Sequence, residues 1–185
     1  MVEIRDEKLL DAFIESGEIR HFDELVRRHI GKVRSMIYPM VLNDADTDDL
    51  TQEVFLRVVD NISGFRKMAL FSTWLHKIAM NTTYSFLRKK SRNFIVNYAD
   101  TPEQPDNSSP PASNLVAEEI DSQIGNALAS LSPSLRSAIT LITIQGMSVK
   151  EAAKVEGCLA ATIYWRVHEA RRILRNKLRG KGIEV

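Results

Sequence analysis

Apolar residues recur at helical spacing along most of the chain. The segments that show this pattern are residues 6–16, 19–38, 46–62, 71–91, 115–131, 134–145, 148–156 and 160–178. Apolar side chains three, four and seven positions apart form one face of an α-helix, and this face can pack on a core. We find no convincing period-two alternation of the kind that marks a half-buried strand. The pattern therefore predicts an all-α protein.

Proline, glycine and serine divide these segments. Four of the six prolines lie in residues 97–114, where no apolar period survives. Such a composition is typical of an extended, mobile connection. We expect two small helical domains, residues 1–92 and 117–185, joined by a flexible linker at residues 93–116. Pro39 is expected to end or bend the second helix because proline lacks the amide hydrogen.

The charge distribution is uneven although the formal net charge is only +1. Residues 44–60 carry six acidic side chains and one arginine, whereas residues 61–99 carry seven basic side chains and no acidic one. Residues 132–185 carry ten basic and four acidic side chains. An acidic block followed by basic ones favours two different partners, a basic protein surface and a polyanion. The alternative is that both blocks are solvated helix faces.

The last two segments have the form of a helix-turn-helix. Residues 148–156 are short and begin with a predicted capping box, Ser148 with Glu151, and residues 160–178 are long and basic. A recognition helix enters the major groove by its N-terminal half. Side chains off the buried stripe there can contact base edges, while the arginines can anchor phosphates. The alternative is a helical hairpin that packs on a neighbour.

Several kinds of chemistry find no support in the sequence. The single cysteine, Cys158, excludes an internal disulfide and a multi-thiolate zinc site, and the four histidines are scattered. We therefore expect no metal, no cofactor and no catalytic residues, so the chain is not expected to be an enzyme. No apolar run approaches 18 residues and the first residues do not resemble a secretory signal, so we expect a cytoplasmic protein without membrane insertion. Cys158 is expected to be a small core residue, and a redox role is left open.

Two motifs carry a resemblance to a known family. Residues 48–55 read DDLTQEVF and residues 71–82 read FSTWLHKIAMNT, and together they resemble region two of bacterial extracytoplasmic function (ECF) sigma factors. Residues 131–178 resemble region four of the same family. The resemblance covers nearly all of the chain except the linker. It implies a sigma factor that binds RNA polymerase core and directs it to specific promoters.

The resemblance assigns roles to residues of region two. The acidic helix would dock on the clamp helices of the largest polymerase subunit through Asp48, Asp49, Gln52 and Glu53. The loop at residues 64–70 would hold a base flipped from the minus-10 element. Base contacts would come from Phe65 and Asn81, and Lys77, Tyr84 and Arg88 would line the adjacent DNA backbone. Four of these residues, Lys77, Asn81, Tyr84 and Arg88, are spaced at i, i+4, i+7 and i+11, so they share one face of the predicted helix.

Region four would read the minus-35 element. The base-facing positions are Tyr164, Trp165, His168 and Glu169, and the expected phosphate contacts are Thr162, Arg166 and Arg171. The family often opens this helix with Pro-x-Gly-Thr-Val, whereas residues 159–163 read LAATI here. We therefore expect an unusual minus-35 preference. The resemblance further implies an anti-sigma factor that holds the protein inactive.

Two other classes of protein compete with this interpretation. A stand-alone helix-turn-helix repressor or activator would explain residues 148–178 but not the acidic helix or the aromatic and basic helix after it. An interaction adaptor without DNA contact conflicts with the net charge of +6 on residues 132–185. Binding to promoter DNA that depends on core polymerase would separate the sigma factor from both alternatives.

Overall fold

The computed structural model describes residues 5–65, 69–97 and 115–179, and most of these residues are helical, with no strand among them. The first group of helices comprises α1 (Asp6–Ser16), α2 (Ile19–Val41), α3 (Asp44–Asn61), a 3-10 turn (Ile62–Gly64) and α4 (Phe71–Asn97). The second group comprises α5 (Leu115–Ala129), α6 (Pro133–Ile139), a π-helical turn (Thr140–Ile144), α7 (Val149–Glu156) and α8 (Ala160–Arg179). The predicted all-α class is confirmed.

Helix α2 continues through the proline that was expected to end or bend it. Pro39 is buried inside the helix, which ends two residues later at Val41. The next residue, Leu42, adopts a positive φ of 56° and donates its N–H to the carbonyl of Tyr38. The terminal carbonyl of Met40 gains a further donor, the Arg136 guanidinium of α6, at 2.8 Å. These contacts satisfy carbonyls that a helix end otherwise leaves without partners.

The other predicted boundaries hold closely, with three differences. Asn43 caps α3 by accepting the N–H of Asp46, so α3 starts at Asp44 rather than at residue 46. Helix α4 extends to Asn97 and α5 begins at Leu115, so helix covers both ends of the predicted linker, and residues 98–114 lie outside the described residues. The predicted helix at residues 134–145 ends in a π-helical turn. The capping box at Ser148 and Glu151 is confirmed.

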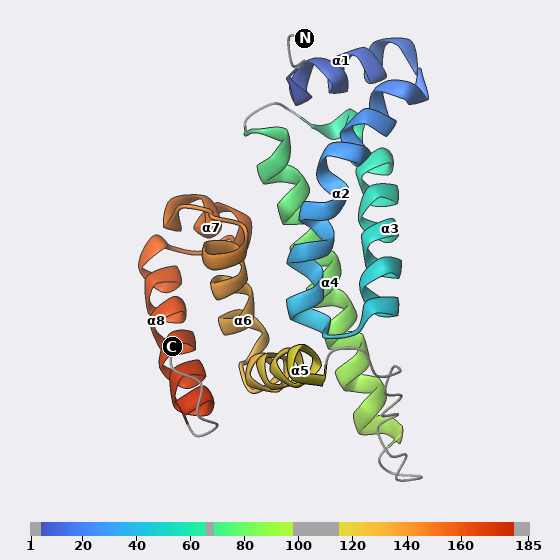
Figure 1. Ribbon diagram of the computed structural model, residues 1–185. Helices are drawn as coiled ribbons and strands as arrows, with labels where there is room; N and C mark the ends of the chain where they lie inside the picture. The colour runs from blue at the N-terminus through green and yellow to red at the C-terminus, as the bar shows by residue number, and fades with distance from the viewer. Residues whose placement is uncertain (1–4, 66–68, 98–114, 180–185) are drawn as a thin grey trace.

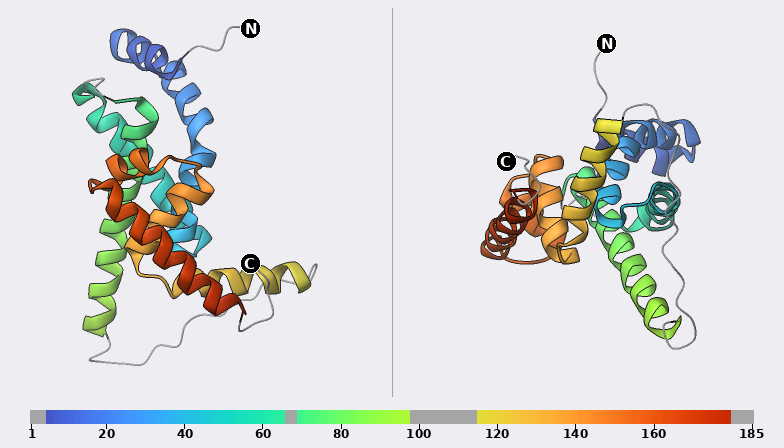
Figure 2. Two further views of the ribbon diagram at one scale, coloured as in Figure 1. Left: turned by 90° about the vertical axis from the view of Figure 1, so that its left-hand side faces the viewer. Right: turned by 60° about the horizontal axis from the view of Figure 1, so that its bottom comes forward.

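The two groups of helices pack directly against each other. Helix α2 and helix α4 form the centre of the first group, with α3 on one side and the second group on the opposite side (Figure 1). In the second group, α6 and α7 lie between α8 and the first group (Figure 1 and Figure 2). One apolar core runs across the boundary: Met36, Leu75 and Met80 belong to the same cluster as Leu141 and Ile163.

Candidate functional site

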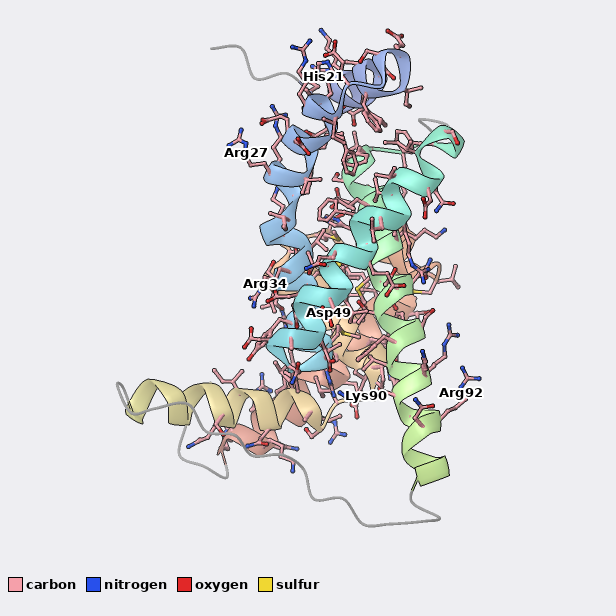
Figure 3. All side chains as sticks on the ribbon, turned by 90° about the vertical axis from the view of Figure 1, so that its right-hand side faces the viewer. His21, Arg27, Arg34, Asp49, Lys90 and Arg92 are labelled. Atoms are coloured by element: carbon pink, nitrogen blue, oxygen red, sulfur yellow. The ribbon has the colours of Figure 1, made fainter. Side chains whose placement is uncertain are left out.

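The predicted polymerase-binding residues of α3 lie on the solvent-facing side of the helix. Asp49, Gln52 and Glu53 lie on the outer face, away from the second group of helices, and Figure 3 shows Asp49 on that face. Glu53 forms an ion pair of 2.6 Å with Arg57 on the same helix. Three of the four predicted polymerase-binding residues therefore share a solvent-facing surface.

Asp48 lies one helical turn before Gln52 and is also exposed, but it reaches toward α2. Its carboxylate accepts a hydrogen bond of 2.7 Å from Arg34 on α2, and the same guanidinium donates to Asp44 at 2.6 Å. The two carboxylates raise the pKa of Arg34, the Asp48 hydrogen bond being the larger cause. Asp48 thus fastens the start of α3 to α2, while 55% of its side chain stays exposed.

An exposed leucine completes the outer face of α3. Leu56 is 66% exposed, and it lies seven positions after Asp49. Asp60 follows at eleven positions, so both side chains share the face of Asp49. Sequence reasoning missed Leu56 because an apolar residue in a helix is first assigned to the core. The sequence does contain a signal for an exposed Leu56, because its spacing of seven positions from Asp49 puts it opposite the buried stripe of α3.

Helix α4 presents a basic and polar face that is only partly open. Lys77, Asn81 and Arg88 are exposed, as the helical spacing predicts. Tyr84 is instead half-buried, and its hydroxyl donates to both carboxylate oxygens of Glu156 on α7, at 3.0 and 3.2 Å. Burial, and then the negative charge of Glu156, raise the pKa of the Tyr84 phenol well above its usual range. Tyr84 therefore does not face solvent in this arrangement.

Phe65 belongs to an aromatic cluster beside the start of α4. Its ring centroid lies 5.1 Å from that of Trp74 and 6.3 Å from that of Phe71, and the contact with Phe71 is edge-to-face. Phe65 is half-buried, so part of its ring remains accessible. The expected base-flipping loop includes residues 66–68, which lie outside the described residues. Phe65 is consequently supported from one side by two aromatic rings.

A pocket of 320 Å³ lies beside this cluster, between α2, the start of α4 and the turn that joins α6 to α7. His76 lines it and is only 7% exposed, with no hydrogen-bond partner for either ring nitrogen among the described residues. Burial, reinforced by electrostatic repulsion from His29 and Lys32, lowers the pKa of His76 to about 4. His76 is therefore neutral at neutral pH.

The predicted recognition helix, α8, exposes its aromatic pair. Tyr164 is 67% exposed and Trp165 is 63% exposed, and His168 also faces solvent. An open groove of 660 Å³ runs along this face, with Tyr164, His168 and Arg171 among its lining residues. Large exposed aromatic rings beside arginines suit contact with bases and phosphates, because the rings offer apolar faces and the arginines offer charge.

Two predicted DNA contacts on α8 are engaged within the protein. Arg166 donates to Glu156 at 2.9 Å, and Glu156 keeps only 4% of its side chain exposed. Glu169 accepts two hydrogen bonds from Arg172, at 2.6 and 2.8 Å, which lower the pKa of its carboxyl group. Thr162 is half-buried and Arg171 is exposed. In this arrangement the Arg166 guanidinium is therefore partly engaged by Glu156, and its phosphate contact stays a prediction.

Family profiles match both groups of helices. The profile described as Sigma-70 region 2 matches residues 25–93, and the profile described as Sigma-70, region 4 matches residues 121–174. The chain is also 33% identical over 176 residues to the ECF RNA polymerase sigma factor SigE of Mycolicibacterium smegmatis. The match covers 92% of this chain and 66% of that protein. The chain belongs to the ECF family of sigma factors.

Further relatives agree with this assignment to the ECF sigma factors. The ECF RNA polymerase sigma-E factor of Escherichia coli K12 is 29% identical over 184 residues, and the match covers 95% of each chain. The sigma factor RpoE of Bartonella quintana, solved in complex with the anti-sigma factor NepR, superposes with a TM-score of 0.68 at 25% identity, covering 85% of this chain and 96% of that one. The structure of CnrH in complex with the cytosolic domain of CnrY supports the fold, with a TM-score of 0.70 at 24% identity, covering 95% and 98%.

Other kinds of site are not found in the part of the sigma factor that the structure describes. Its histidine, cysteine, aspartate and glutamate side chains form no group suited to a metal ion. None of its described helices is both long and apolar enough to cross a membrane. Cys158 is a free thiol, half-buried at the turn between α7 and α8, where it packs against the apolar core.

Proposed function

We propose that this ECF sigma factor binds RNA polymerase core and directs it to promoters that carry a minus-10 and a minus-35 element. The observation that carries the proposal is the presence of two unlike surfaces on one chain. An acidic face on α3 suits a basic protein, and the aromatic and basic surfaces of α4 and α8 suit DNA. A stand-alone DNA-binding protein has no use for the first surface.

Core binding is assigned to the outer face of α3. Asp49, Gln52 and Glu53 supply charge and hydrogen-bond acceptors, and Leu56 supplies an apolar centre. Interfaces of this kind gain affinity from the apolar centre and orientation from the charged rim. Asp48 adds a further carboxylate beside Gln52, and its ion pair with Arg34 holds the start of the helix in place.

Promoter reading is divided between the two groups of helices. Residues 1–92 read the minus-10 element with Phe65 and Asn81 at the flipped base, and Lys77, Tyr84 and Arg88 follow the DNA backbone. Residues 117–185 read the minus-35 element, with residues 93–116 as the connection. Base contacts come from Tyr164, Trp165, His168 and Glu169, and phosphate contacts come from Thr162, Arg166 and Arg171. An aromatic face and an amide edge are suited to an unstacked base.

Regulation and location follow from the family. We assign an anti-sigma factor as the silencing partner, supported by the Bartonella quintana relative, which was solved with its anti-sigma factor. We place the protein in the cytoplasm, where bacterial core polymerase works. The chain itself catalyses no reaction, since phosphodiester formation belongs to the polymerase.

Run-off transcription tests the proposal. Purified core polymerase is incubated with a library of promoter sequences, with and without the full-length protein. We expect transcripts from a subset of promoters, and only when core polymerase and the full-length protein are both present. The sequences of the promoters that are used reveal the minus-10 and minus-35 elements. If no transcript appears and the protein alone binds duplex DNA tightly, the chain is a stand-alone regulator.

The recognition helix yields a specificity prediction. Glu169 can accept a hydrogen bond from the amino group of cytosine, whereas arginine prefers guanine. We expect Glu169→Arg to change the favoured minus-35 base, by about tenfold at one position. Selection of minus-35 sequences with the holoenzyme measures this change. Arg175→Glu, on the same helix but nearer its C-terminus, serves as a control that weakens binding without changing the preferred base.

A further inference from the structure

A buried carboxylate joins three helices of region four. Glu156 is the last residue of α7, and only 4% of its side chain is exposed. Its Oε1 accepts a hydrogen bond of 2.5 Å from the Ser137 hydroxyl on α6, and its Oε2 accepts one of 2.9 Å from Nη1 of Arg166 on α8. Both contacts lie within region four, so neither depends on the third donor, Tyr84 of α4. One carboxylate thus connects the recognition helix to the two helices that support it.

The end of α7 is an unfavourable place for a negative charge. Burial takes the carboxylate out of water, which is costly unless the charge is paired. The C-terminal end of a helix also carries partial negative charge, which disfavours an acidic side chain. An apolar side chain at position 156 would incur neither cost. The physical reason for a carboxylate here therefore lies in its donors, and among the three donors Arg166 is the one with the opposite charge.

Arg166 lies at the edge of the proposed DNA-binding surface of α8. It keeps 21% of its side chain exposed, whereas Tyr164 and Trp165 are largely exposed. Helical spacing puts Thr162 and Arg166 on one side of the proposed base-facing residues and Arg171 on the other side. A recognition helix in the major groove has a phosphate backbone on each side. The position of Arg166 therefore suits a contact with one of the two backbones.

The ion pair leaves Arg166 able to bind a phosphate at the same time. A guanidinium carries five N–H donors in a rigid plane, and the contact with Glu156 is made by Nη1. One edge of the group can face the carboxylate while another edge faces the DNA. An arginine side chain that is unrestrained in the free protein loses rotamer freedom on binding. Pairing with Glu156 reduces that loss, because the guanidinium is already held in place.

We propose that Glu156 is a positioning residue for promoter binding, which holds the Arg166 guanidinium at the rim of α8 so that it can bind a phosphate beside the minus-35 element. The inference rests on the proposed function and extends it to a residue that is buried within region four. Ser137 fixes one carboxylate oxygen, so the other is presented to Arg166. The effect is on affinity and not on sequence preference, because phosphate contacts carry no base information.

The salt dependence of promoter binding tests the role of Glu156. Holoenzyme assembled from core polymerase and the full-length protein is titrated onto a promoter recovered by run-off transcription, at several salt concentrations. Glu156→Gln keeps the size of the side chain and removes its charge. We expect binding to weaken about fivefold, and the slope of log affinity against log salt to become shallower by about 0.9, as for the loss of one phosphate contact. The loss should be the same for every minus-35 sequence.

Further variants show whether Glu156 acts through Arg166. Arg166→Ala should lose the same phosphate contact, and adding Glu156→Gln should then weaken binding no further. Arg166→Lys keeps the positive charge and the native Glu156 but lacks the planar fork that can face two groups, so its binding should also weaken. Glu15→Gln is the matched control, because it removes the same charge from an exposed residue of α1 and should change neither the affinity nor the slope. Circular dichroism of the free proteins checks that each variant is folded, and Arg166→Lys decides the question if Glu156→Gln is not.

Several results would overturn the role of Glu156 as a positioning residue. An unchanged slope for Glu156→Gln, wild-type affinity for Arg166→Lys, or a double variant weaker than Arg166→Ala would show that Glu156 does not act through a phosphate contact of Arg166. Tighter binding of Glu156→Gln with a steeper slope would show that the carboxylate withholds Arg166 from DNA. Wild-type holoenzyme that binds no promoter would overturn the proposed function together with this inference, so the two failures are distinguishable.

Discussion

Reversal of charge at Asp49 is expected to weaken core binding at least tenfold. Asp49 is exposed on the outer face of α3, beside Glu53 and Leu56. Asp49→Lys places a cation against a basic partner, and like charges brought together at an interface weaken association strongly. Titration of labelled core polymerase with the full-length protein measures the dissociation constant.

Glu15→Lys is the control for this experiment. It makes the same change of charge on an exposed residue of α1, far from the outer face of α3 in sequence, and should leave the dissociation constant unchanged. Leu56→Ala separates the apolar contribution from the charge, because its loss of affinity should persist at high salt, whereas added salt screens the effect at Asp49. Asp49→Lys protein that binds core as tightly as Glu15→Lys protein would remove α3 from the interface.

The helices were predictable because their boundaries depend on local chemistry. Gly17 and Gly157 adopt positive φ values of 69° and 65° at the ends of α1 and α7, as glycine after a helix predicts. The capping box at Ser148 follows from four consecutive residues. The end of helix α2 depends on a contact that is not local, since the carbonyl of Met40 accepts a hydrogen bond from Arg136, 96 positions farther along the chain.

The same distinction applies to the candidate surfaces. Helical spacing correctly placed Asp49, Lys77 and Trp165 on exposed faces, because period alone decides which face a residue occupies. Spacing cannot show that Tyr84 and Arg166, which are far apart in the sequence, share the carboxylate of Glu156. Such a contact depends on how the two groups of helices pack. The roles of the individual residues in DNA and polymerase binding remain predictions.

Truncation of Phe71 is expected to produce the largest loss of stability. Its side chain is fully buried, and its ring contacts Trp74 and Phe65 as well as His29 of α2, at a centroid distance of 5.4 Å. Phe71→Ala should lower the free energy of unfolding by about 3–5 kcal/mol, the usual cost of deleting a buried phenylalanine. Denaturant titration followed by circular dichroism measures the change.

Phe86→Ala is the control, with the same substitution on the same helix. Phe86 is only half-buried, and Lys90 lies 5.4 Å from the centre of its ring. Less apolar area is exposed by its removal, so the loss of stability should be clearly smaller than at Phe71. Equal losses for the two variants would show that the aromatic cluster does not anchor α4.

The position of Phe71 links this stability to promoter reading. Helix α1 fastens the start of α4, because Glu7 accepts the N–H of Phe71 at 3.3 Å and Asp6 lies 2.7 Å from the buried His29 ring. Phe65 rests on the ring that this arrangement holds. In Phe71→Ala protein that is still folded at low temperature, Phe65 loses that support. Promoter opening should therefore fall more than core binding, because core binding depends on the distant face of α3. An equal fall in both would show that the cluster supports the fold alone.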